Sequence, residues 1–424
     1  MRILHEIRGL PLAIRLLLVN QLGVTTGFYL LIPYLATHLG DDLGLSAATV
    51  GVVLGVRTLS QQGLFLLGGS AADRLGARGV IIAGCAIRTA GFALFALGDG
   101  LPVLLAASVL SGVAGALFNP AVRTFLAQES GERRAEAFAL FNVFATTGAL
   151  AGPLLGSALL LVDFRAAALT AAGIFALLTC AQALVLPAGD AVPATGSVTS
   201  DWREVFGNRR FLAFALAMVG MFTLESQLYL LLPDGARQAT GWDGAAGLVF
   251  VVGTVAGITL QLRITRSLKA RGAGGRWIVA GLVLMGLAFV PPMLVTTAGP
   301  GDGAPGPVLR VLPVLAGALL LHLGVMTAQP FVMELIPAFG RPALTGTYFG
   351  VFYAVSGIAA ALGNTAVGWT MDIAGESGAD STLRALLPWV CCLTTGLDSA
   401  AGVAWLHRAG TLPRTRRAPV AVTA

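Results

Sequence analysis

Charged residues are scarce in this sequence, at 11% of 424 residues, while apolar residues make up 56%. Soluble domains carry roughly 25% charged residues. A water-facing surface needs polar side chains, and this chain has too few of them to cover one. The composition therefore excludes a soluble globular protein and a disordered one, and it indicates a protein whose solvent is lipid.

Cysteine is also rare. The four cysteines lie inside apolar runs, without C-x-x-C spacing or a neighbouring histidine, so neither a metal site nor a disulfide framework is predicted. The common catalytic motifs are missing as well: there is no G-x-S-x-G, no phosphate-binding G-x-x-x-x-G-K-[ST] and no H-E-x-x-H. We predict a protein that is not an enzyme and needs no cofactor. Because it lacks a nucleotide-binding motif, any energy-requiring step should be driven by an ion gradient.

Long apolar runs dominate what is present. A membrane-spanning helix needs ~20 apolar residues, and continuous runs favour helices over the alternating pattern of a β-barrel. The first run is too long for a removable signal and is expected to remain as a membrane helix. The twelve predicted spans are 12–37, 47–70, 78–97, 101–127, 137–160, 166–187, 210–233, 244–264, 276–297, 308–333, 344–371 and 385–406.

A polar stretch divides the chain near its middle. We expect a first six-helix bundle at 1–187, a connector at 188–209, a second bundle at 210–408 and a tail at 409–424. The end of the connector, residues 201–206, has the pattern of a short amphipathic surface helix. The two halves share local patterns: Phe28–Pro33 matches Leu228–Pro233, and Asn119-Pro120 matches Gln329-Pro330. Duplicated six-helix units predict a substrate site at the repeat interface near the bilayer midplane.

The basic residues predict the orientation. With a cytoplasmic N-terminus, 21 of the 27 lysine and arginine residues fall at cytoplasmic ends and 4 at outer ends. The positive-inside rule therefore places both termini in the cytoplasm. The basic balance thus reflects membrane topology, and we predict no binding to nucleic acid.

The loop between the second and third runs reads Gly69-Ser70-Ala71-Ala72-Asp73-Arg74-Leu75-Gly76-Ala77-Arg78. It resembles the signature loop of the major facilitator superfamily, with departures at Ala71 and Ala77. The resemblance implies an all-α integral membrane fold of twelve transmembrane helices in two pseudo-symmetric six-helix bundles. It also implies a gating role for Gly69, Asp73, Arg74, Gly76 and Arg78. Physically, Asp73 can accept charge-assisted bonds at the N-terminus of a neighbouring helix.

The fifth run carries Gly148-x-x-x-Gly152-Pro153-x-x-Gly156. Small residues four apart let helices approach closely, and a proline removes one backbone hydrogen bond. The pattern resembles the motif that marks antiport exporters in the superfamily. Together with Gly55-Val56-Arg57, Gln61-Gln62-Gly63 and Arg88-Thr89-Ala90-Gly91-Phe92, it resembles the MdtH-type branch of multidrug exporters.

Ionisable residues inside membrane helices are costly and often functional. We predict that Glu225 exchanges protons and that Arg57 and Arg88 supply charge balance or gating. The resemblance places an arginine in the fourth helix where this chain has Ser108. Asp398 is expected at the periphery and His322 in a structural hydrogen bond.

Polar and aromatic side chains on the spans are candidates for the substrate cavity. The first helix has Asn20 and Gln21 where many drug exporters keep an acid. The predicted cavity residues are Asn20, Tyr29, Gln61, Asn119, Tyr229, Gln329 and Tyr353. Further aromatic candidates are Phe28, Tyr348, Phe349 and Phe352.

These patterns predict proton-coupled efflux of small amphipathic drugs or secondary metabolites by alternating access. A proton-coupled uptake permease for a sugar or peptide and a non-transporting membrane receptor remain alternatives. The expected partners are a small-molecule substrate, protons and the lipid bilayer, and the chain is expected to be a monomer. One lysine against 26 arginines suggests a bacterial source, and therefore the bacterial cytoplasmic membrane.

Overall fold

A computed structural model describes residues 11–187, 197–241, 245–272, 274–297, 307–376 and 382–413. Within these ranges the secondary structure is helical and contains no strand. Of the predicted connector at 188–209, residues 188–196 lie outside the described residues, as do residues 414–424 of the predicted tail at 409–424. The chain forms two compact units: Met1–Gly207 with Ile336–Ala354, and Asn208–Leu335 with Val355–Ala424.

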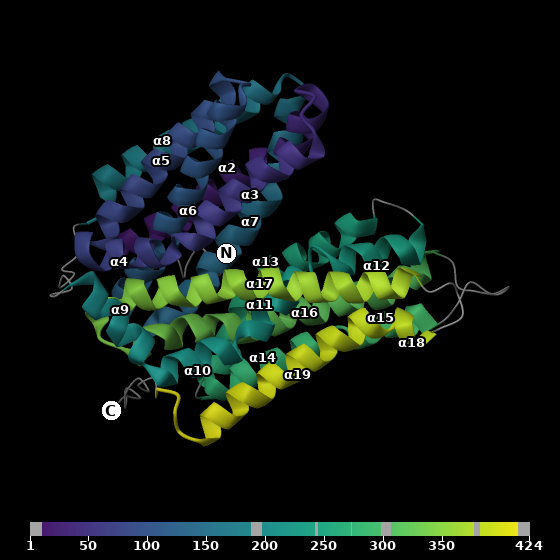
Figure 1. Ribbon diagram of the computed structural model, residues 1–424. Helices are drawn as coiled ribbons and strands as arrows, with labels where there is room; N and C mark the ends of the chain where they lie inside the picture. Colours follow the sequence, from purple (N-terminus) through teal and green to yellow (C-terminus); the bar gives the residue numbers. More distant parts are fainter. Residues whose placement is uncertain are drawn as a thin grey trace. The chain divides into compact units, whose positions relative to one another are not determined.

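The first unit contains the first six predicted spans and a short helix after them (Figure 1). The helix expected at 201–206 is present as α9. The helices are α2 (Leu12–Thr37), α3 (Ala47–Gly63), α4 (Phe65–Leu75), α5 (Ala77–Leu97), α6 (Leu101–Glu129), α7 (Arg134–Leu160), α8 (Phe164–Val185) and α9 (Val198–Gly207).

The second unit contains the later spans, several of which are interrupted. Its helices are α10 (Arg209–Ala217), α11 (Val219–Ser226), α12 (Leu231–Thr240), α13 (Ala245–Ala270), α14 (Gly275–Leu287), α15 (Val290–Thr297), α16 (Pro307–Leu335), α17 (Thr345–Glu376), α18 (Thr382–Ala385) and α19 (Leu387–Arg408). The first turns of α17, up to Ala354, and the 3₁₀ turns Ile336–Phe339 and Pro342–Leu344 group with the first unit.

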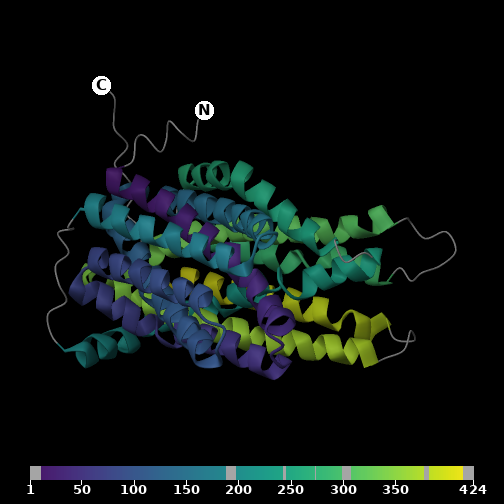
Figure 2. The same cartoon turned by 90° about the horizontal axis from the view of Figure 1, so that it is seen from above.

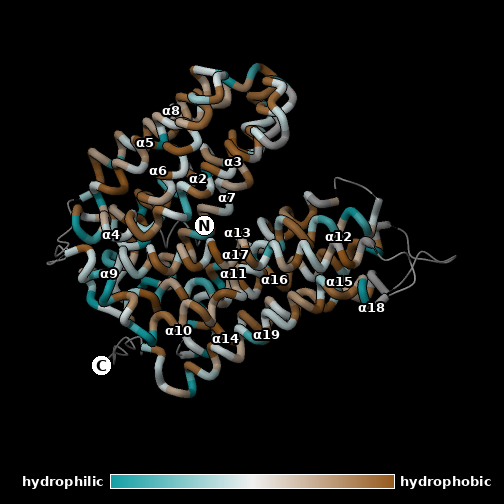
Figure 3. Tube along the Cα trace, in the orientation of Figure 1, coloured by the Kyte–Doolittle hydropathy of each residue, from teal (hydrophilic) through white to brown (hydrophobic). Residues whose placement is uncertain are grey.

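Eleven helical segments in the described part of the chain are long and apolar enough to cross a membrane. They correspond to eleven of the twelve predicted spans. The remaining one, 47–70, is divided at Leu64 into α3 and α4, so neither piece has spanning length by itself. Figure 3 shows hydrophobic residues along the helices and hydrophilic ones mainly at their ends and turns.

Small residues set the spacing of the helices in the first unit, which lie side by side in Figure 2. A Cβ atom on Gly91 of α5 would lie 3.0 Å from the Ser111 nitrogen of α6, and one on Gly84 would lie 3.2 Å from Phe118. Close backbone approach of this kind is the usual basis of helix association in lipid, where hydrophobic burial gives little driving force.

Candidate functional site

The signature loop lies where α4 ends, and Asp73 is its most buried charged side chain, with 6% of its surface exposed. Its carboxylate accepts hydrogen bonds from the Gly346 N–H at 2.6 Å, the Thr347 N–H at 2.6 Å and the Thr347 hydroxyl at 2.7 Å. Gly346 and Thr347 lie in the first turn of α17, whose amides otherwise lack partners. Asp73 therefore caps α17 from another helix.

Burial raises the pKa of Asp73 to about 7, and the hydrogen bonds from Thr347 and Gly346 oppose that shift. The neighbouring carboxylate of Asp201 adds to the rise. The backbones of α4 and α17 approach closely here because the two facing residues are glycines: a Cβ on Gly69 would collide with the Gly346 carbonyl. Gly76 has φ +81° and turns the chain from α4 into α5, a conformation that glycine adopts without strain.

Helix α9 packs on the same loop, a feature the sequence did not reveal. Arg74 forms an ion pair with Asp201, which is only 4% exposed. The Trp202 indole N–H donates to the Ser70 hydroxyl at 2.8 Å. The amphipathic pattern of 201–206 predicted the helix, but nothing in it identified the partners.

Two further arginines extend this cluster. Arg341 makes a two-pronged contact with Glu204, at 3.0 and 2.6 Å. Arg78 donates to the Leu186 carbonyl at 2.7 Å and to the Ala183 carbonyl at 2.8 Å, and so caps the C-terminus of α8. The signature-loop residues thus connect α4, α8, α9 and the start of α17 within the first unit.

The glycine motif of the fifth span lies on α7 and forms a seam with α2. Cβ atoms on Gly148, Gly152 and Gly156 would each meet α2: the first at 2.6 Å from the Leu22 carbonyl, the second at 2.8 Å from the Thr26 carbonyl, the third against the Leu30 carbonyl. Pro153 lies within α7, and its carbonyl accepts a hydrogen bond from the Tyr34 hydroxyl at 2.8 Å. The motif residues therefore hold the two helices in backbone contact.

Arg57 and Arg88 both lie in the membrane part of the first unit. Arg57, on α3, donates to Gln61 at 3.3 Å and to Thr58 at 3.2 Å. Arg88, on α5, is 5% exposed and lies over the rings of Phe118 and Phe175. Neither has a carboxylate partner among the residues that the structure describes.

Glu225 lies near the end of α11, beside an interruption of the seventh span between Ser226 and Leu231. The interruption carries a polar cluster: the Ser226 hydroxyl and the Gln227 amide donate to Asn364 of α17 at 2.7 and 3.0 Å. Glu225 is therefore placed next to polar side chains and a helix break, and its own carbonyl accepts a hydrogen bond from the Leu228 N–H within that break.

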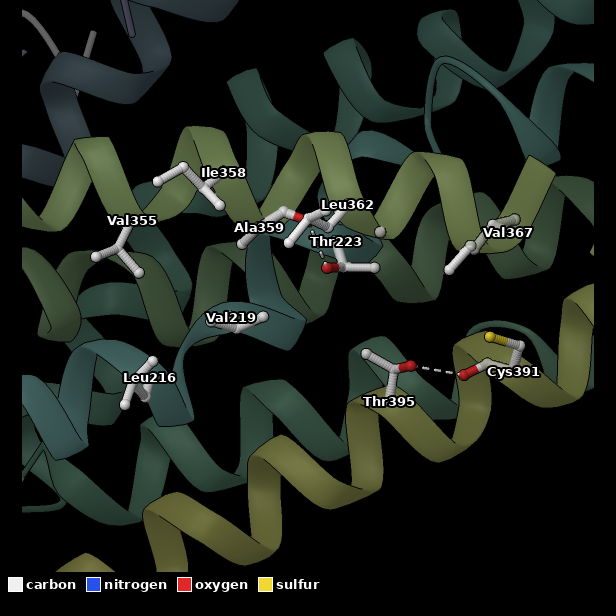
Figure 4. A pocket seen from close by; sticks show the side chains of 12 residues that line it. Leu216, Val219, Thr223, Val355, Ile358, Ala359, Leu362, Val367, Cys391 and Thr395 are labelled. Atoms are coloured by element: carbon white, nitrogen blue, oxygen red, sulfur yellow. Dashed lines mark hydrogen bonds between the residues drawn. The ribbon is translucent and has the colours of Figure 1, made fainter. Parts of the chain in front are cut away.

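A cavity of about 480 Å³ lies between α10, α11, α17 and α19 (Figure 4). Its walls are apolar, apart from Thr223, Cys391 and Thr395. The Thr223 hydroxyl donates across it to the Ala359 carbonyl at 3.2 Å. In the first unit the matching helices, α2 and α7, are in backbone contact along the glycine seam, while α11 and α17 touch through Thr223 beside the cavity.

The predicted cavity residues occupy different environments. Asn20 is fully buried and bonds Gln182, inside the first bundle. Tyr229 is 65% exposed. Tyr29, Gln61, Asn119, Gln329 and Tyr353 are part-buried, while Tyr348, Phe349 and Phe352 are buried.

The other two ionisable candidates lie in the second unit. The His322 ring bonds the Ala318 carbonyl at 2.8 Å, which agrees with the expected structural hydrogen bond. Asp398 is exposed on α19.

The helices and their buried glycine contacts define a multi-pass membrane protein. Residues 17–364 match the sequence profile of the Major Facilitator Superfamily, and the chain belongs to that superfamily. It is a transporter of this family and not an enzyme. The predicted fold class and family are thereby confirmed.

The relatives cover most of the chain. It is 40% identical over 400 residues to an uncharacterized MFS-type transporter of Mycobacterium tuberculosis, with 93% of each chain covered. It is 32% identical over 358 residues to the multidrug resistance protein MdtH of Photorhabdus laumondii, covering 84% of this chain and 86% of that one. The fold is shared with the Escherichia coli fucose:proton symporter, at a TM-score of 0.69 and 15% identity over 92% of this chain and 98% of the symporter.

Proposed function

We propose that this protein is a proton-coupled exporter of small amphipathic compounds, working as a monomer in a bacterial cytoplasmic membrane with both termini inside. Protons enter as substrate leaves. The observation that carries the proposal is the Gly148–Gly152–Gly156 seam with Pro153, because this pattern resembles the exporter motif and every glycine is used in helix contact. The similarity to proteins named as multidrug resistance proteins supports the same direction of transport.

In this proposal Glu225 takes up and releases the proton. A carboxyl group in a membrane helix is neutral when lipid or protein surrounds it and ionised when water reaches it, so alternating access can change its protonation. The helix interruption beside it supplies polar neighbours. Movement of one charge through the membrane potential is worth ~2.3 kcal/mol per 100 mV, which is enough to bias the cycle.

Asp73 and Arg74 form the gate in the same proposal. Their contacts with α17 and α9 close one face of the protein in one half of the cycle and break in the other. The gate is reversible because its bonds are few and sit at a helix terminus, where water can replace them.

The test is transport in proteoliposomes with an imposed proton gradient and a panel of cationic, neutral, zwitterionic and anionic drugs. We expect substrate-dependent proton flux in the wild-type protein and its loss in Glu225→Gln. The control is Asp398→Asn, which removes an exposed carboxyl group from the same unit and should retain flux. Proton flux that survives Glu225→Gln would refute the role of Glu225, and substrate movement in the same direction as the protons would refute antiport.

A further inference from the structure

The membrane helices of the first unit carry an unbalanced charge. The six spans between residues 12 and 187 contain no aspartate or glutamate within their predicted bounds, yet Arg57 and Arg88 lie well inside two of them. Arg15 and Arg123 lie within a few residues of the ends of their spans, where side chains can reach the interface. The imbalance therefore concerns two guanidinium groups at membrane depth.

Arg88 is too deep for a lipid headgroup to neutralise it. It lies eleven residues after the start of α5 at Ala77 and nine before its end at Leu97. At 1.5 Å per residue these separations are roughly 17 Å from the start and 14 Å from the end of the helix. Its Nε atom is buried and has no hydrogen-bond partner among the described residues.

The two arginines belong to one aromatic cluster. The Arg57 guanidinium lies 5.3 Å from the centre of the Phe28 ring, and Arg88 lies 5.5 Å from that of Phe175. Phe92 connects them, with ring centres 6.5 Å from Phe28 and 4.8 Å from Phe175. The aromatic faces stabilise the cations partly but supply no hydrogen-bond acceptor in the guanidinium plane.

Arg57 is the accessible member of the pair. Its side chain is part-exposed, and its Nε is unpartnered among the described residues. Its NH groups donate only long hydrogen bonds to neutral oxygens, at 3.3 Å to Gln61 and 3.2 Å to Thr58. Arg88 lies close enough to repel it electrostatically. An anion at Arg57 would therefore meet the attraction of both charges.

We propose that Arg57, supported by Arg88, binds an anionic group of the transported compound, and that the preferred substrates are aromatic carboxylates. The proposal rests on the transport function proposed above and names its substrate class. A guanidinium group pairs with a carboxylate through parallel N–H···O bonds. The part-exposed ring of Phe28 beside Arg57 offers a surface for an aromatic body, and the buried ring of Phe92 supports it from behind. Arg57 makes the contact, and Arg88 is a positioning residue that acts through its charge.

The experiment measures equilibrium binding, which needs no gradient. Purified protein in phosphatidylcholine nanodiscs is titrated at pH 7.5 with three probes that share a pyrene body: 1-pyrenebutyrate, its neutral methyl ester and a trimethylammonium analogue. Empty nanodiscs correct for partition into lipid. We expect the carboxylate to bind at least about tenfold more tightly than the ester, the size of effect typical of hydrogen bonds to charged groups.

Variants identify the residues responsible. Arg57→Gln and Arg88→Gln should each reduce the preference for the carboxylate by about tenfold, and Arg57→Lys should retain part of it. The matched control is Arg165→Gln, which removes an exposed arginine paired with Asp99 in the same unit and should leave the preference unchanged. If Arg88→Gln fails to fold, Arg57→Gln decides, since Arg57 is not fully buried.

Equal binding of carboxylate and ester, no binding of any probe, or a preference that survives Arg57→Gln would each overturn the inference. Loss of the preference in nanodiscs that contain phosphatidylglycerol would assign the site to an anionic lipid and would overturn it as well. A carboxylate preference without any substrate-driven proton flux would support the anion site and contradict the proposed antiport, so the two failures are distinguishable.

Discussion

The seam between α2 and α7 gives a prediction whose size follows from the structure. A Cβ atom added at Gly152 would lie 2.7 Å from the Tyr29 Cβ and 2.8 Å from the Thr26 carbonyl oxygen. Carbon atoms in contact prefer about 3.5 to 4.0 Å, so Gly152→Ala must push the helices apart locally by roughly 0.7 Å or more. The obstacles are a backbone oxygen and a Cβ atom, whose positions the backbone of α2 fixes, so neither can rotate away.

Overpacking of this kind costs about 1–3 kcal/mol. The Gly152→Ala protein should therefore unfold more readily than wild type, by about that amount, in reversible unfolding titrations with sodium dodecyl sulfate in mixed micelles. Gly173→Ala is the matched control, because it is the same change in α8 of the same unit but meets no atom within 4 Å. There the gain in helix propensity should stabilise the protein by up to about 1 kcal/mol.

The two alanine variants should therefore shift stability in opposite directions. If Gly152→Ala were as stable as Gly173→Ala, α2 and α7 would not be in backbone contact, and the structural role assigned to the glycine motif would be wrong. If both variants were destabilised by the same amount, the cause would be a general cost of alanine, and the overpacking at Gly152 would be refuted as well.

Two predictions concern the cluster at the signature loop. Because packing raises the pKa of Asp73 from 3.8 to about 7, the packed state binds the proton more tightly than the released one. The contact should therefore weaken as pH rises from about 4 to about 7, by up to tenfold per unit, and should change no further above pH 7, where Asp73 is ionised in both states. Amide exchange in the first turn of α17, corrected for its intrinsic pH dependence, should show this trend in wild type and a flat profile in Asp73→Asn. Asp201→Asn should weaken the docking of α9 by about 1–3 kcal/mol, because it removes the carboxylate that pairs with the part-buried Arg74. Glu204→Gln breaks only an exposed ion pair with Arg341 and should weaken the docking by less than about 1 kcal/mol. Proteolysis or amide exchange of α9 distinguishes the two, and equal effects would contradict the ranking by burial.

Much of the fold could be predicted from the sequence because lipid imposes a simple rule: a spanning segment must satisfy its own backbone, so long apolar runs become helices. The run at 47–70 shows the limit of that rule. Hydropathy gives the length of a run but not the interruption at Leu64, which depends on how α3 and α4 pack on α6. The breaks of the seventh span are of the same kind.

The site was predictable where the chemistry was local. A carboxylate next to glycines at a loop suggested a helix-terminus contact, and Asp73 makes one. The partners of Arg74 were not predictable, because Asp201 is 127 residues away and only the fold brings it near. Asn20 shows what a sequence pattern leaves out: a polar residue on a span suggests a cavity wall, but only the fold reveals its burial and its bond to Gln182, 162 residues away. Its place in a substrate cavity stays a prediction.

The docking of α9 has a consequence for how the chain can be divided. This helix immediately precedes the second unit in sequence, but its side chains bond to α4 through Arg74 and Ser70. If the gene were divided within codons 188–196, the second polypeptide would begin with α9, the helix that binds α4 of the first polypeptide. If the gene were divided after Gly207, α9 would stay on the first polypeptide and could not join the two. Co-expressed fragments should therefore reassemble better from the first division than from the second.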